Sequence, residues 1–239
     1  MNAPGKANRA MVLPALALVT STAFGPILQP LPSTSENSRV IVGALAVSQF
    51  TVGTQNVEMK YYAKADLLAG ISLGSLQLKS NLSAALQSTS STEKTSVLIA
   101  SGESRYGVIG EGNTPEGNYR EVNFQLFKNT EANANDPMYQ KSLLITGEIN
   151  GKLTSIWTER ESTIRAVSES STGVEVENNS EMVLEFDMNK LFAGVDFTTA
   201  VDANSDGRIE IGPNSADGNA AILSRIESNI ESSVVLKKR

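Results

Sequence analysis

The segment KSLLITGEINGKLTSIWT, residues 141–158, decides the fold class of this chain. Its two apolar runs, 141–149 and 152–158, flank Asn150-Gly151, and both turn residues tolerate the positive φ that a type I′ turn requires. The segment therefore predicts two antiparallel strands joined by a two-residue turn, which is the strongest short-range sign of a β-hairpin.

Alternation of apolar and polar residues recurs on both sides of this hairpin. It is typical of half-buried strands, because successive side chains of a strand point to opposite faces. One helix is expected over 220–232, where apolar side chains share one face and Asp217 or Asn219 can cap the start. The further strands expected are 40–50, 57–63, 71–78, 95–100, 122–126, 164–167, 182–188 and 233–236.

These elements predict an all-β fold: an antiparallel β-sandwich of the immunoglobulin-like, Greek-key kind, with one C-terminal helix. The sandwich domain is expected over residues 51–239. Residues 25–50 contain three prolines and a Ser/Thr run, which indicates a linker or N-terminal arm.

The N-terminus has the pattern of a secretory signal peptide. Lys6 and Arg9 precede a short apolar run over 11–19, and the small residues Ser21 and Ala23 follow. Residues 1–24 are therefore a signal peptide, or else a retained N-terminal strand or arm. The apolar run is too short for a membrane span, so we expect no transmembrane helix in the mature chain. The export signal indicates a secreted or cell-surface location.

Composition excludes several classes of function. The 239-residue chain contains no His and no Cys, which removes His-based triads, thiolate nucleophiles, disulfides and imidazole or thiolate metal sites. Only hard cations that prefer oxygen ligands remain as resident metals. With 20 basic and 26 acidic residues the net charge is −6, which disfavours nucleic acid as a partner.

The most specific motif is DANSDGRIE, residues 202–210. Asp202, Asn204 and Asp206 occupy positions 1, 3 and 5 of an EF-hand-type calcium loop, Gly207 occupies position 6, and the Arg208 carbonyl can add a fourth oxygen. This spacing folds three side-chain oxygens around one point. The sequence therefore predicts Ca²⁺ in a loop over 202–213.

The motif departs from an EF-hand at its end, since Pro213 stands at position 12 in place of a bidentate acidic ligand. Glu210, Asp217 or Asp196 can supply the missing oxygen. The other interpretation is an Asx-rich turn, in which the Asp and Asn side chains bond only their own backbone. If Ca²⁺ binds, we expect a structural role with micromolar-to-millimolar affinity, which suits an extracellular setting.

Two short segments match the residue spacing of catalytic motifs. Residues 70–74 match G-x-S-x-G, and residues 91–94 match S-x-x-K. The first lacks a His base and a strand-to-helix turn, and the second lacks its companion motifs, so we expect no enzyme. A glycan-active hydrolase using paired carboxylates is the less favoured alternative. Its candidate pairs are Glu159 with Glu161 and Glu175 with Glu177.

The C-terminal half resembles a known group of domains. The residues that carry the likeness are the run Pro115–Leu126, the strand Lys141–Gly147, Trp157, the run Leu184–Phe192, the Asp/Asn loop and Asn219 with its helix. Together they resemble, over roughly residues 57–239, uncharacterised β-sandwich domains of secreted and surface lipoproteins of Bacteroidota. The resemblance implies an exported immunoglobulin-like sandwich without catalytic residues. This chain lacks the lipobox cysteine of a lipoprotein.

Two functions compete on this basis. The first is a calcium-stabilised, non-catalytic extracellular module for adhesion or binding, whose partner is a surface glycan or protein. The second is a structural subunit of a surface filament, which self-associates when the apolar strand 40–47 pairs with a neighbour's sheet edge.

Overall fold

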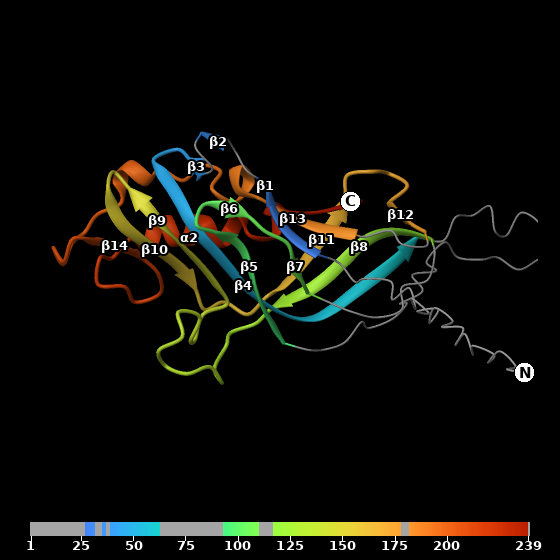
Figure 1. Cartoon of the computed structure of the whole chain (residues 1–239), viewed down its shortest axis with the longest axis horizontal. Helices are drawn as coiled ribbons and strands as arrows, with labels where there is room; N and C mark the ends of the chain where they lie inside the picture. Colours follow the sequence, from blue (N-terminus) through green and yellow to red (C-terminus); the bar gives the residue numbers. More distant parts are fainter. Residues whose placement is uncertain are drawn as a thin grey trace, which may run out of the picture.

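The computed structural model describes residues 27–31, 35–36, 39–62, 93–109, 117–177 and 182–238. They form one large mixed β-sheet with two short α-helices (Figure 1). The helices are α1 (Met188–Leu191) and α2 (Ala220–Asn229), with 3-10 turns η2 (Phe197–Thr199) and η3 (Glu231–Ser233). The strands are β1 (Ile27–Leu31), β2 (Ser35–Glu36), β3 (Arg39–Val42), β4 (Leu45–Tyr62), β5 (Lys94–Ala100), β6 (Glu103–Ser104), β7 (Gly107–Val108), β8 (Gly117–Leu126), β9 (Leu143–Ile149), β10 (Lys152–Thr158), β11 (Thr163–Ser168), β12 (Val174–Val176), β13 (Met182–Asp187), β14 (Arg208–Ile211) and β15 (Val234–Lys238).

The hairpin that decided the fold class is confirmed. Strands β9 and β10 pair antiparallel, with Ile149 opposite Lys152. Asn150 and Gly151 have φ of 51° and 78°, as a type I′ turn requires.

The mostly-β fold is confirmed, whereas the prediction of an antiparallel sheet is wrong, because the sheet is mixed. The main path of the sheet runs β14-β10-β9-β4-β8-β11-β15-β13-β1-β7, and the described residues show no immunoglobulin-like pair of sheets. Three neighbouring pairs are parallel: β1 with β13, β10 with β14, and β11 with β15. Alternation identifies a strand and its buried face, but not its neighbour or direction, so an all-antiparallel sheet did not follow from it.

Strand β4 joins the two halves of the sheet. Its first half pairs with β9 and its second half with β8, so that β9 and β8 lie end to end along one edge. At the junction the Gly53 N–H donates to the Ser142 carbonyl at 2.8 Å, and the Gly53 carbonyl accepts the Phe127 N–H at 3.0 Å. A Cβ on Gly53 would lie 2.3 Å from the Phe127 carbonyl oxygen, so only glycine fits this approach.

The sheet curls around its core. Phe50 of β4 packs edge-on against Phe186 of β13, with ring centroids 5.2 Å apart, although β8, β11 and β15 lie between these strands in the sheet order. The two halves of the curl therefore bury a common set of apolar side chains. The largest fully buried ones are Tyr119, Phe50, Phe124, Phe186, Leu45, Leu98, Ile99, Ile109, Leu126, Leu143 and Ile145.

The segment expected to be a linker or arm contributes strands to this sheet. Val40–Val42 pairs with Leu45–Val47 in the β3–β4 hairpin, and Val40, Leu45 and Val47 are buried. The apolar segment 40–47 thus consists of the end of the short strand β3 and the start of the long strand β4, which pair with each other in the chain's own sheet. Residues 1–24, the expected signal peptide or retained segment, lie outside the described residues.

Helix α2 matches the predicted C-terminal helix, and it buries Ile222, Leu223 and Ile226 as the pattern indicated. It ends at Asn229, and the remainder of the expected helix is the 3-10 turn η3. Helix α1 was not expected. It begins because the Asp187 carboxylate accepts the N–H groups of Asn189 and Lys190, which ends strand β13.

Candidate cation-binding loop

The loop that follows η2 is organised by nested Asx turns. The Asp202 carboxylate accepts the N–H groups of Asp206 and Gly207, each at 3.1 Å. The Asn204 side-chain oxygen accepts the Asp206 N–H at 3.0 Å, and the Asp206 carboxylate accepts the Arg208 N–H at 2.9 Å. Gly207 takes a φ of 85° at the bend. The predicted residues of positions 1, 3 and 5 are therefore brought together in one turn, tied by backbone N–H donors.

A basic side chain that the sequence did not indicate completes the loop. The Lys152 ammonium lies 2.9 Å from a carboxylate oxygen of Asp202, whose side chain is only 4% exposed. The Lys152 hydrogen bond is the main cause that lowers the pKa of Asp202 below its ordinary value, helped by the lysine's charge and the Gly207 and Asp206 amides, whereas burial opposes the shift. Lys152 opens β10, whose parallel pairing with β14 was not predictable.

Asp217, expected as a substitute ligand, is buried and bonds the backbone of a neighbouring segment. We call these hydrogen bonds the Asp217 clasp. Asp217 is 3% exposed, and its carboxylate accepts the N–H groups of Ala203 at 2.9 Å, Asn204 at 3.3 Å and Glu210 at 2.7 Å. Both carboxylate oxygens are therefore engaged by the backbone. This contact holds the loop that precedes β14 against the turn that precedes α2.

Asn219 extends the clasp. Its side-chain amide donates to the carbonyls of Val201 at 2.9 Å and Glu210 at 2.8 Å, and its oxygen accepts the Val201 N–H at 3.0 Å. Asn219 stands at the start of α2 but makes no side-chain cap bond there. With Asp217 it satisfies both backbone groups of Glu210 on β14, the last strand of the sheet path, so side chains take the place of a missing neighbour strand.

The two remaining predicted ligands lie on β14. Arg208 is exposed and Glu210 is half-buried, and their backbone N–H groups donate to the carboxylates of Asp206 and Asp217, respectively. Asp196, the upstream alternative, accepts the N–H and the hydroxyl of Thr198 at the start of η2, and these bonds lower its pKa. Within the described part of the chain, no three His, Cys, Asp or Glu side chains form a metal-binding group.

The single tryptophan, Trp157, packs against Gly212, which directly follows β14. A Cβ on Gly212 would lie 2.0 Å from the Trp157 ring, so the indole packs directly on the Gly212 backbone. The Lys141 ammonium lies 5.9 Å from the ring centroid on a half-buried Trp157. The fluorescence of Trp157 is therefore a natural reporter of this loop.

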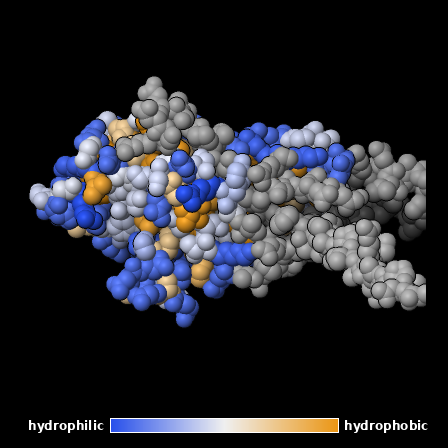
Figure 2. Space-filling model, viewed as in Figure 1, coloured by the Kyte–Doolittle hydropathy of each residue, from blue (hydrophilic) through white to orange (hydrophobic). Residues whose placement is uncertain are grey.

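Exposed apolar side chains are few and separated by polar ones on the face drawn in Figure 2. Among the exposed large apolar side chains of the described residues, two flank the ion pair of the loop in sequence: Leu153 follows Lys152 and is 55% exposed, and Val201 precedes Asp202 and is 51% exposed. The loop thus presents apolar side chains to solvent beside its charges.

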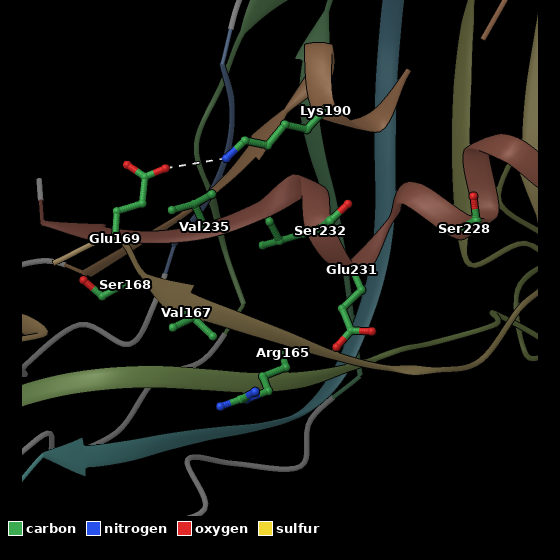
Figure 3. A pocket seen from close by; sticks show the side chains of 10 residues that line it. Arg165, Val167, Ser168, Glu169, Lys190, Ser228, Glu231, Ser232 and Val235 are labelled. Atoms are coloured by element: carbon green, nitrogen blue, oxygen red, sulfur yellow. Dashed lines mark ion pairs between the residues drawn. The ribbon is translucent and has the colours of Figure 1, made fainter. Parts of the chain in front are cut away.

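A separate pocket of about 510 Å³ opens where β11 and β15 diverge (Figure 3). Its charges are largely paired, because Lys190 lies 3.5 Å from Glu169 and the Arg165 guanidinium donates to Glu121 at 2.5 Å. Three serines, three valines and Glu231 line the rest.

Of the two carboxylate pairs named for the less favoured hydrolase alternative, Glu159 and Glu161 have other partners. Glu159 forms an ion pair with Lys128 at 3.0 Å, and Glu161 accepts the Lys128 N–H at 3.3 Å. Glu175 lies on β12, and Glu177 follows that strand. The G-x-S-x-G motif at 70–74 and the serine of the S-x-x-K motif lie outside the described residues.

Comparisons with protein-family models, with curated proteins and with solved structures found no match to this chain. None of the helices in the described residues has the length and apolar character needed to span a membrane.

Proposed function

We propose that this chain is a non-catalytic, calcium-stabilised β-module that serves adhesion or binding outside the cell. The observation that carries the proposal is the joining of Asp202, Asn204 and Asp206 in one hydrogen-bonded turn. Two carboxylates, a side-chain amide oxygen and a main-chain carbonyl are the hard oxygen ligands that Ca²⁺ prefers. The ion would tie β14 to the rest of the loop.

Ca²⁺ would take over the position that the Lys152 ammonium holds beside Asp202. The lysine is half exposed, so it can swing into water when a divalent ion neutralises the carboxylate. Because the lysine competes with the ion, affinity in the micromolar-to-millimolar range follows. That range suits the calcium-rich exterior of cells.

Three further observations support an extracellular binding role. Residues 1–24 have the pattern of an export signal, and the run Pro115–Leu126 and its companions resemble surface β-domains of Bacteroidota, which have a sandwich architecture. Leu153 and Val201 expose apolar surface beside the loop. We propose that this end of the molecule contacts a surface glycan or protein.

Thermal unfolding with chelator and with added Ca²⁺ tests the proposal. A hundredfold excess of Ca²⁺ over its dissociation constant should stabilise the fold by about 2.7 kcal/mol. Asp206→Asn should weaken the effect, whereas Lys152→Met should strengthen it, because the competing ammonium is gone. An unchanged melting temperature in millimolar Ca²⁺ for both the parent chain and Lys152→Met contradicts the proposal.

The filament alternative needs a different strand from the one expected, because residues 40–47 pair with each other.

A further inference from the structure

Strand β1 occupies an unusual place in the sheet. It lies parallel to β13 from Ile27, opposite Val183, to Leu31, opposite Asp187, and its other edge meets β7 (Figure 1). The strand nearest the N-terminus in the described residues is therefore inserted between two strands that come later in the chain.

The backbone pairing of β1 is complete on one side only. Strand β7 pairs only with Ile27 and Leu28, so residues 29–31 have β13 as their single neighbour in the described sheet. Pro30 lies in this part, and it has no N–H to donate to the sheet. A short parallel strand with an incomplete second neighbour belongs to the part of a fold that opens at low cost.

Strand β13, by contrast, needs a partner on this edge. Leu184 and Phe186 are fully buried in the core, and β15 pairs with the opposite edge of β13. When β1 leaves, a row of backbone N–H and C=O groups along β13 becomes unpaired. A strand of identical sequence satisfies that row equally well.

We infer that β1 exchanges between copies of this chain, so that β1 of one molecule pairs with β13 of another. Residues 32–38 connect β1 to β3 and include β2, which pairs with β3. When β2 also detaches, these seven residues can reach at most about 23 Å. That reach is sufficient to place β1 on a neighbouring molecule. The partner is thus a second copy of the chain, and the interaction does not depend on Ca²⁺.

Reciprocal exchange closes a dimer, whereas one-way exchange gives an open chain of subunits. Both forms use the same β1–β13 register, so one experiment detects either. This inference goes beyond the calcium-stabilised module, and either of the two proposals can fail alone.

The absence of cysteine in this chain allows a direct test by disulfide trapping. Gln29 lies opposite Glu185 in the β1–β13 register, and neighbouring strands are about 4.8 Å apart, within the range of a disulfide. Full-length Gln29→Cys and Glu185→Cys are mixed, unfolded, refolded together and oxidised gently in chelator. Exchange should produce a covalent dimer of one chain of each kind.

The matched control mixes Gln29→Cys with Leu153→Cys, because Leu153 is exposed on β10, away from β13 in the sheet order. At about 10 µM protein, exchange should make cross-linking about a hundredfold faster than in this control, because paired strands have an effective concentration of about 1 mM. Light scattering of the unmodified chain should show dimers or larger species that increase with concentration. Cross-linking at the control rate, or a monomer at all concentrations, overturns the inference.

Discussion

Replacing Asp217 by Ala should destabilise the fold more than any change in the exposed part of the loop. The buried carboxylate accepts three backbone N–H groups, from Ala203, Asn204 and Glu210. A hydrogen bond to a charged group contributes about 1.5–3 kcal/mol, so the two shorter bonds alone give about 3–6 kcal/mol. Asp217→Asn should lose most of the same free energy of unfolding, because its NH₂ group would face a backbone N–H and cannot accept a hydrogen bond from it.

Urea unfolding followed by Trp157 fluorescence and by far-UV circular dichroism measures this free energy. The matched control is Asp136→Ala, which removes an exposed carboxylate that accepts the Met138 N–H. Because water competes for this exposed carboxylate, the loss should be that of an ordinary hydrogen bond, about 0.5–1.5 kcal/mol, and not that of a buried charged one. A loss at Asp217 no larger than that of the control would refute the clasp. The loss should be the same in chelator and in Ca²⁺; a loss seen only in Ca²⁺ would make Asp217 a ligand instead.

Two further substitutions test the junction and the ion pair. Gly53→Ala should cost about 1–3 kcal/mol in urea unfolding, since its Cβ would collide with the Phe127 carbonyl; an unchanged midpoint would contradict the close approach. The Lys152 hydrogen bond holds the pKa of Asp202 below its ordinary value of 3.8. The ionised carboxylate of Asp202 therefore stabilises the fold above pH 3.8. This stabilisation disappears as the pH falls through the lower pKa that Asp202 has in the folded chain. The parent chain should therefore lose more stability than Asp202→Asn between about pH 5 and about pH 3, and parallel pH profiles would argue against the ion pair.

The sequence predicted local structure well where the signal was local. Asn150-Gly151 specified its own turn, and the apolar face of 220–232 specified α2, because both depend on neighbours within a few residues. Strand alternation likewise identified most strands. It also divided β4 in two, since Asn56, with a φ of 51°, interrupts the alternation at a register shift within one continuous strand.

The sequence could not predict pairings between distant segments. Lys152 lies beside Asp202 only because β10 and β14 are parallel neighbours, and nothing near either residue encodes that contact. The insertion of β1 beside β13 is of the same kind. Asp217 was interpreted as a metal ligand because its type and spacing fit that role, whereas its three amide partners depend on how the turn before α2 packs against β14.

A calorimetric Ca²⁺ titration of the purified chain, repeated with Asp202→Asn plus Asp206→Asn, tests the calcium proposal most directly. We predict saturable binding of one ion per chain with a micromolar-to-millimolar dissociation constant, a matching change in Trp157 fluorescence, and loss of both in the double variant. Absence of binding at about 10 mM Ca²⁺, or equal binding by the double variant, would contradict the account.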